Sequence, residues 1–193
     1  ISEALMAVYR LFWDEFSSWY LEMVKPAYQQ PIDKATYEQT LEFFEVLLKL
    51  LHPFMPFITE ELFQALKPRG EKESVMVSLQ PKVEEYCEKC IQRMEVTKEI
   101  IAGVRNIRAE KGISPREAFE LHFKGDLDEK NNAIIQKLAN ISAISQSDNA
   151  EQGASSSFMV GTVEISIPLG SNVNVEEEKK KMEAEIAYLE GFL

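Results

Sequence analysis

The sequence predicts a mainly α protein: an antiparallel helix bundle, followed by a small α+β subdomain and a truncated coiled-coil helix. Three patterns predict this fold class. Apolar residues recur every three or four positions up to Gly112, alternate with polar residues in two later stretches, and return at heptad spacing near the end. We therefore expect a helix-bundle domain over 1–112, an α+β linker subdomain over 113–170 and the start of a coiled-coil arm over 171–193.

The first helix is expected over residues 1–24, where apolar side chains follow helical spacing and aromatic residues are dense. Phe12 and Phe16 fall on one face and are assigned to the core, whereas Trp13 and Tyr20 share a second face. A helix that is apolar on two faces either lies centrally in a bundle or offers one face to a partner.

Two further helices have clear start signals. Asp33 is expected to cap a helix that runs to residue 52, because its carboxylate can accept a free backbone N–H of the first turn. Pro56 fits the first position of the next helix, which should end before Pro68. An extended segment is expected over 75–79.

A long fourth helix is predicted from Pro81 to Gly112, a residue suited to the turn after a helix. Its expected buried stripe consists of Val83, Cys87, Cys90, Met94, Thr97, Ile101 and Val104. We interpret the two cysteines, one turn apart, as structural thiols. A zinc site would need two further ligands, and a thioredoxin-like redox motif would need a strand before the cysteines, and the sequence shows neither. Unpaired thiols imply a reducing compartment, and the predicted location is cytoplasmic.

The subdomain after Gly112 shows strand patterns. Phe119, Leu121 and Phe123 alternate with polar residues, so His122 should face solvent. One further strand is expected over 158–169.

A helix should begin at Asp128, and a short edge strand is expected over 143–147. The last segment has apolar residues seven apart, which predicts the beginning of a coiled coil. These heptad residues are Val175, Met182 and Leu189.

The charge balance is acidic, with a net charge of −11, and this argues against nucleic acid as a partner of the chain as a whole. Residues 98–116 are an exception, with five basic and two acidic side chains. Arg105, Arg108 and Lys111 recur every three residues there, a ladder that could follow a phosphate backbone. Salt bridges on a solvated helix face explain the same pattern equally well.

No catalytic motif is present in the sequence: it has no P-loop, GxGxxG, nucleophile elbow or HExxH. The paired glutamates lie near expected helix starts, where they suit the helix dipole better than acid–base chemistry. His52, which precedes Pro53 at a helix end, is interpreted as structural. We therefore expect no catalytic residue, no metal and no cofactor in this chain, and no run of apolar residues is long enough to cross a membrane. The first residues show neither a start methionine nor a signal peptide, as expected for an internal segment.

Three stretches, at residues 12–22, 51–62 and 104–113, resemble sequences of a known family, the valyl-tRNA synthetases. Residues 51–62, LHPFMPFITEEL, and 12–22, FWDEFSSWYLE, are similar to the anticodon-binding domain of the class I synthetases for valine, isoleucine and leucine. Residues 104–113, VRNIRAEKGI, are most similar to the valine enzymes. The order of a small α+β linker, the sequence IPLG at 167–170, an acidic run and heptads also resembles the C-terminal part of that family.

The resemblance implies that the bundle binds the anticodon stem-loop of tRNA-Val and that the coiled coil braces the outer corner of the tRNA. The catalytic and editing domains, and ATP with magnesium, would belong to the N-terminal part of the same enzyme. Aromatic stacking, base-edge contacts and phosphate contacts require a mixed set of side chains. The candidate tRNA-binding residues are Arg10, Trp13, Asp14, Ser17, Arg105, Asn106, Arg108 and Lys111.

Two alternatives stay open. One is the same region of an isoleucyl or leucyl enzyme, although the chain lacks a zinc-binding cysteine cluster near its end. The other is a helical scaffold that pairs with a protein partner through its heptads. Salt distinguishes this scaffold from an RNA-binding module, because RNA binding weakens steeply as salt rises.

Overall fold

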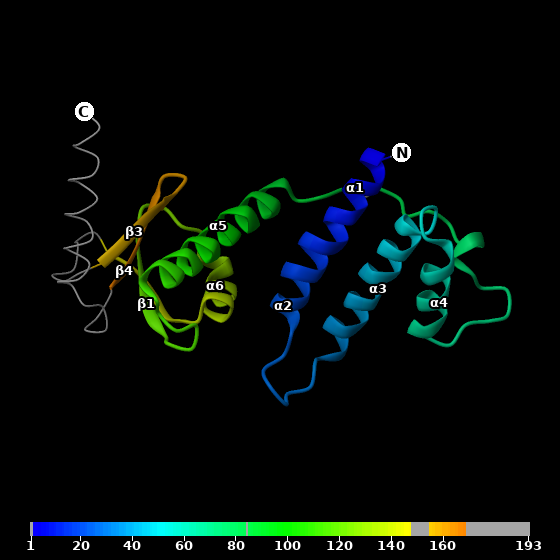
Figure 1. Cartoon of the computed structure of the whole chain (residues 1–193), viewed down its shortest axis with the longest axis horizontal. Helices are drawn as coiled ribbons and strands as arrows, with labels where there is room; N and C mark the ends of the chain where they lie inside the picture. Colours follow the sequence, from blue (N-terminus) through cyan, green and yellow to red (C-terminus); the bar gives the residue numbers. More distant parts are fainter. Residues whose placement is uncertain (1, 84, 148–154, 169–193) are drawn as a thin grey trace. The chain divides into compact units, whose positions relative to one another are not determined.

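The computed structural model describes residues 2–83, 85–147 and 155–168, and it divides the chain into two compact units, 1–86 and 87–193. Unit 1 is helical. Unit 2 combines two α-helices with a four-stranded sheet (Figure 1). The predicted coiled-coil arm lies outside the described residues.

Unit 1 begins with a continuous helical segment that changes its winding. It consists of α1 (Ser2–Arg10), a π-helical stretch η1 (Leu11–Tyr20) and α2 (Leu21–Val24). Helices α3 (Lys34–Leu51) and α4 (Pro56–Leu66) follow, and a 3-10 turn η2 (Val75–Val77) replaces the predicted extended segment. The predicted starts of α3 and α4 are confirmed, since Asp33 accepts the N–H of Thr36 at 2.9 Å and Pro56 opens α4.

The core of unit 1 lies between α3, α4 and η2. Leu48, Phe63 and Val75 are buried together, and Phe44 and Leu66 pack against them. His52 is a structural residue as predicted, because its ring Nδ1 lies 2.8 Å from the hydroxyl of buried Thr59.

Unit 2 begins with α5 (Glu88–Lys111), the longest helix among the residues that the structure describes. Four strands form the mixed sheet β2-β1-β4-β3: β1 (Phe119–Lys124), β2 (Ile141–Gln146), β3 (Ser155–Val160) and β4 (Val163–Pro168). A 3-10 turn η3 (Glu129–Asn131) and α6 (Asn132–Ala139) join β1 to the parallel strand β2. Helix α5 contacts β3 and α6, and α6 contacts β2 (Figure 1).

The predicted antiparallel helix bundle over 1–112 is wrong, and the protein is mainly α with a small sheet. The predicted fourth helix is α5, and it belongs to unit 2. The other helices of the expected bundle belong to unit 1. Its residues Ile100, Ile101 and Val104 are fully buried beneath the sheet strands and α6 that it contacts. A sheet of this size needs a helical layer over its apolar face, and α5 supplies it.

The start of α5 also differs from the prediction. The helix begins at Glu88 rather than near Pro81, and Val83, Cys87 and Cys90 are exposed rather than parts of a buried stripe. Its predicted end is confirmed, since Gly112 adopts the left-handed conformation with φ 63°.

The sheet corrects two further expectations. The single strand predicted over 158–169 is a hairpin of β3 and β4 that turns at Gly161, where φ is +58°. His122 is buried rather than solvent-facing, because β1 is an inner strand and His122 lies between Ser145 of β2 and Ser166 of β4. The edge strand expected near 143–147 is confirmed as β2.

Candidate nucleic-acid interface

The first helical segment has two aromatic faces. The buried face packs on α3, where the rings of Phe16 and Phe44 stack with centroids 5.9 Å apart and an interplanar angle of 11°. Phe12 also contacts Phe44, and Tyr20 meets Phe43 edge-on. These contacts anchor the segment and fix which side chains point outward.

The exposed face carries a stacked pair of aromatic rings. Tyr9 and Trp13 lie with centroids 6.4 Å apart and nearly parallel, at 9°, while about half of each side chain remains exposed. Rings of this kind offer a flat face on which an unpaired base can stack. The sequence pattern placed Tyr9 one turn before Trp13 but did not include it among the candidate residues, and the structure adds it.

Polar candidates surround this pair. Arg10 and Asp14 are exposed next to the rings, and Ser17 is half-buried one turn further on. The neighbouring Ser18 donates to the carbonyl of Trp13 at 2.8 Å, within the π-helical stretch. Stretches of π-helix are rare and occur often at functional sites. The structure therefore brings Arg10, Trp13 and Asp14 together on the surface of unit 1.

The second candidate set lies at the end of α5 in unit 2. Arg105 and Asn106 are exposed and Lys111 is half-buried. Arg105 also donates to the carbonyl of Leu138 at 3.3 Å, which holds its guanidinium near the C-terminal end of α6. Cations so placed can contact phosphates while the helix holds them in position.

Arg108 differs from its neighbours because only 6% of it is exposed. Its guanidinium donates to the carbonyls of Ser114, Glu117, Ala139 and Asn140 at 2.7–3.1 Å. It also lies over the ring of Phe119, with the guanidinium carbon 4.0 Å from the centroid. Burial lowers the pKa of Arg108 and the nearby Glu117 carboxylate opposes this shift. Arg108 thus joins α5 to the loop before β1 and to the end of α6, and we leave it out of the candidate surface.

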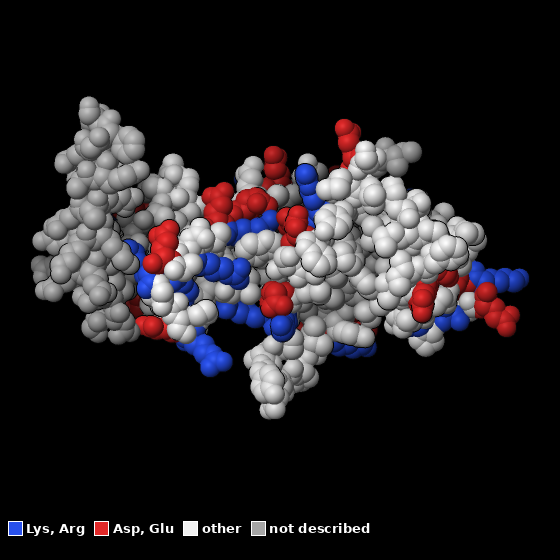
Figure 2. Space-filling model, in the orientation of Figure 1, with Lys and Arg blue, Asp and Glu red and all other residues white. Residues whose placement is uncertain are grey.

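Charged side chains of both signs are mixed on the surface. On the face that Figure 2 shows, lysines and arginines are interspersed with aspartates and glutamates. A nucleic acid would therefore meet local groups of cations rather than one continuous basic field.

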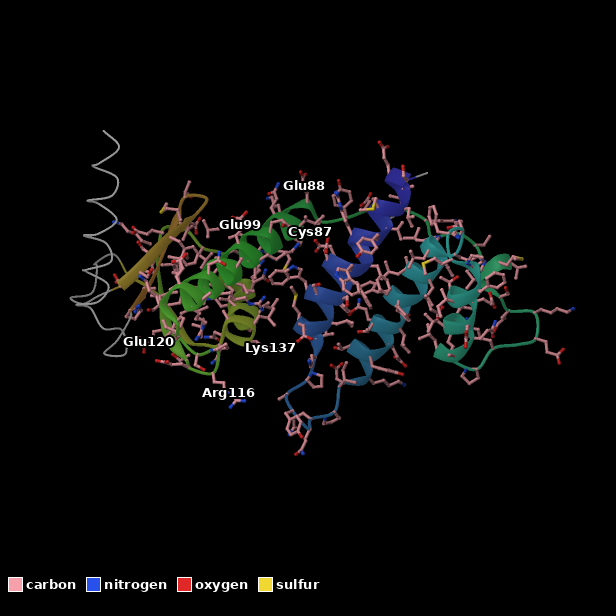
Figure 3. The ribbon with its side chains drawn as sticks, in the orientation of Figure 1. Cys87, Glu88, Glu99, Arg116, Glu120 and Lys137 are labelled. Carbon is pink, nitrogen blue, oxygen red and sulfur yellow. A yellow bond between two sulfur atoms is a disulfide. The ribbon has the colours of Figure 1, made fainter. Side chains whose placement is uncertain are left out.

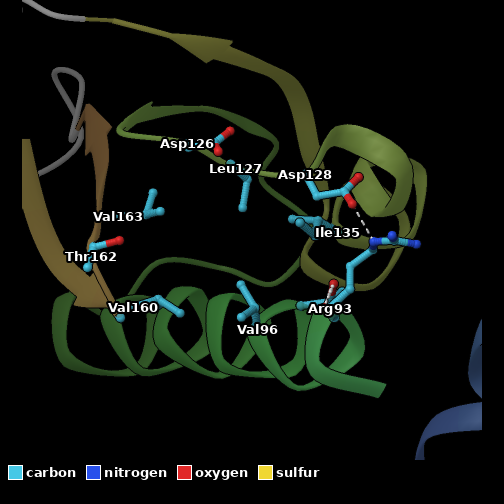
Figure 4. A pocket seen from close by; sticks show the side chains of 11 residues that line it. Arg93, Val96, Asp126, Leu127, Asp128, Ile135, Val160, Thr162 and Val163 are labelled. Carbon is cyan, nitrogen blue, oxygen red and sulfur yellow. Dashed lines mark hydrogen bonds and ion pairs between the residues drawn. The ribbon is translucent and has the colours of Figure 1, made fainter. Parts of the chain in front are cut away.

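Unit 2 contains a cavity of about 280 Å³ between α5, the loop after β1 and the β3–β4 turn (Figure 4). At its rim, Arg93 and Asp128 form an ion pair. The pKa of Asp128 is lowered, first by the backbone N–H of Lys130 and then by Arg93. Apolar residues such as Val96, Ile135 and Val163 form much of the remaining lining. Arg93 and Asp128 neutralise each other at the rim, and Asp126 adds a second carboxylate to the lining.

Within the described part of the chain, no three His, Cys, Asp or Glu side chains are grouped so that they could hold a metal ion. The two cysteines, predicted to be unpaired structural thiols, are instead joined to each other by a disulfide. Among the helices of residues 2–83, 85–147 and 155–168, none has the length and hydropathy needed to span a bilayer.

Comparison with known proteins gives a consistent result. Residues 1–123 match the family model described as the anticodon-binding domain of tRNA ligase. The whole chain is 56% identical to the valine–tRNA ligase of Parabacteroides distasonis and 51% identical to that of Bacteroides thetaiotaomicron, and it covers 22% of each. Over 98% of the chain, identity to the valine–tRNA ligase of Geobacter sulfurreducens is 36%, with 23% of that protein covered. The chain thus spans about a fifth of the length of these relatives.

Proposed function

The chain belongs to the family of tRNA-ligase anticodon-binding domains, and on that premise we propose that it is the tRNA-binding part of a valine–tRNA ligase and recognises the anticodon stem-loop of tRNA-Val. The observation that carries this proposal is the similarity of the entire chain to valine–tRNA ligases, at 56% identity in one case. Because the chain corresponds to about 22% of those proteins, valine activation with ATP and magnesium is assigned to the remainder of the parent enzyme. We propose a cytoplasmic location for the parent, where the exposed disulfide of this chain can be reduced.

In this proposal, the exposed face of the first helical segment receives unpaired anticodon bases. The outer face of Trp13, extended by Tyr9, stacks on a base. Arg10 reaches a phosphate, while Asp14 and Ser17 accept or donate hydrogen bonds at base edges. The buried aromatic face holds this platform rigid against α3.

The end of α5 supplies the second set of contacts. Arg105 and Lys111 interact with phosphates, and Asn106 can both donate and accept hydrogen bonds toward sugar or base edges. The set at the end of α5 suits a chain with a net charge of −11, because phosphate contacts there need only a local group of cations.

The test is a binding titration at low salt, with tRNA-Val, the same tRNA carrying a different anticodon, and tRNA-Ile as ligands. We expect tightest binding to tRNA-Val and weaker binding after the anticodon change. Tighter binding to tRNA-Ile than to tRNA-Val would instead assign the chain to an isoleucyl-tRNA synthetase. Absence of binding to any tRNA, at every salt concentration, would contradict the proposal and favour a protein-interaction scaffold.

A pair of matched variants tests the platform itself. Trp13→Ala removes the exposed stacking ring, and Phe57→Ala removes a ring of α4 that is 90% exposed in the same unit. Loss of one base–aromatic stack costs about 1–3 kcal/mol, so affinity should fall roughly fivefold or more for Trp13→Ala only. If both variants lowered the affinity for tRNA equally, Trp13 would not be a specific contact of the proposed interface.

A further inference from the structure

The start of α5 places the two cysteines of the chain within bonding distance. Cys87 is the N-cap residue of the helix, Cys90 lies in its first turn, and the two are joined by a disulfide with their Cα atoms 5.2 Å apart (Figure 3). That separation lies within the range in which a disulfide forms without backbone movement. The sequence contains no other cysteine, so an intramolecular disulfide in this chain can only join these two.

Both residues are exposed to solvent. Structural disulfides resist reduction, whereas exposed pairs are more easily reduced and re-formed. Soluble thiols and disulfides can therefore reach either sulfur from solvent.

The helix start itself holds the sulfur atoms in place. The Sγ of Cys87 accepts the backbone N–H of Cys90 at 3.2 Å, and the carbonyl of Cys87 accepts the same group at 2.9 Å. This cap requires the backbone geometry that brings Cys87 and Cys90 one turn apart, whether or not the sulfurs are bonded. The N-terminal end of a helix also favours a negative charge, and the thiolate is the form of cysteine that attacks a disulfide.

We propose that Cys87 and Cys90 form a redox-reactive dithiol site whose reaction partner is a low-molecular-weight disulfide of the oxidised-glutathione class. One cysteine thiolate attacks a sulfur of the partner, forms a mixed disulfide and releases one partner thiolate. The second cysteine then attacks the protein sulfur of that mixed disulfide and releases the other partner thiolate. The dithiol loses two electrons and two protons overall, and the partner disulfide is reduced to two thiols.

The disulfide forms at the residue where unit 2 begins. Cys87 is the first residue of unit 2, and the segment before it has no regular secondary structure in its described residues. The disulfide ties the N-cap covalently to the first turn of α5, so this turn opens less often in the oxidised chain than in the reduced chain, where hydrogen bonds alone hold it. The site therefore couples the redox state of the surroundings to the local order of the first turn of α5.

The experiment equilibrates the whole chain in buffers with increasing ratios of oxidised to reduced glutathione, then traps free thiols with N-ethylmaleimide and measures intact mass. As the ratio of oxidised to reduced glutathione rises, we expect the chain to change from carrying two N-ethylmaleimide adducts to carrying none. The mass of the chain without adducts should be lower by two hydrogens, and little of it should carry glutathione. The controls Cys87→Ser and Cys90→Ser should each form a mixed disulfide with one glutathione. The double variant Cys87→Ser/Cys90→Ser should show neither product, and its circular dichroism reports folding.

Amide hydrogen exchange of peptides spanning residues 86–92 supplies a second readout on the same samples. Exchange should be slower in the oxidised chain than in the reduced chain, and the double serine variant should resemble the reduced chain. The proposal would be overturned if the wild-type chain kept both thiols at every ratio or took up two glutathiones. Equal exchange in the oxidised and reduced chains would overturn the proposed closure of the first turn.

Discussion

The ring of Phe158 in β3 lies against Gly103 of α5 and fills the space that a Cβ atom on Gly103 would occupy. The glycine thus provides a notch in the helix into which the sheet inserts an aromatic side chain. This contact fixes where β3 crosses α5, and it explains why a residue that weakens helices stands in the middle of the longest one.

Gly103→Ala should destabilise unit 2. Alanine favours the helix by about 1 kcal/mol, but overpacking a filled site costs about 1–3 kcal/mol, and here the added methyl displaces the Phe158 ring. Urea unfolding followed by circular dichroism should show a lower midpoint. In a Phe158→Ala background the notch is empty, so the same substitution should become stabilising. A stabilising effect of Gly103→Ala in the wild-type background would contradict the inferred packing.

Arg108→Ala should also destabilise unit 2, because it leaves four carbonyls without their common donor. A buried acceptor without a partner costs about 1–3 kcal/mol, so we expect the free energy of unfolding to fall by at least about 2 kcal/mol. Arg108→Lys should recover only part of this loss, since an ammonium group lacks the planar fork of donors. Unchanged stability of the alanine variant would show that the guanidinium does not hold this junction.

Glu60 should make the stability of unit 1 depend on pH. Its carboxylate accepts the Gln64 amide, the Ser74 hydroxyl and the Val75 N–H at 2.7–2.9 Å, and thereby ties η2 to α4. These bonds, first that of Gln64, lower the pKa of Glu60 from its ordinary value of 4.5. Because the pKa is lowered in the folded state, the carboxylate stabilises the fold fully at pH values above 4.5. This stabilisation is lost as the pH falls through the pKa of the folded state.

Glu60→Gln is the matching variant, because it keeps the size of the side chain and removes its charge. Thermal unfolding at neutral pH should occur at a lower temperature in the variant than in the wild type. In acid, where the wild-type carboxyl is protonated, the two curves should converge. A difference that stayed constant from neutral pH to strong acid would mean that the charge of Glu60 does not contribute.

Local signals in the sequence predicted where several helices begin and end. They did not predict which elements pack against one another. Asp33, Pro56 and Gly112 act through groups within a few residues, so their chemistry is visible in the sequence alone. Whether α5 covers a sheet or joins a bundle depends on distant partners, and helical periodicity is the same in both cases. The burial of His122 likewise depends on the strands beside β1.

The candidate site illustrates the same limit. Residues three apart on an α-helix differ by 300° in direction, so Arg105, Arg108 and Lys111 do not form a straight ladder. Arg108 instead continues the buried spacing of Thr97, Ile101 and Val104. That spacing was available in the sequence and could have identified it, whereas the carbonyls that satisfy its charge could not be predicted.

Arg105 is therefore the residue with which to test phosphate contact at the end of α5, because it is exposed and its loss should leave the fold intact. Arg105→Ala should weaken binding to all tRNAs alike and lower the slope of log affinity against log salt by about 1. Lys124→Ala removes the same charge from an exposed position of β1 in the same unit and is the control. It should lower the slope much less, since only a residue at a phosphate releases a condensed counterion on binding. If both variants changed the slope equally, the effect would come from the net charge of unit 2 rather than from a contact at Arg105.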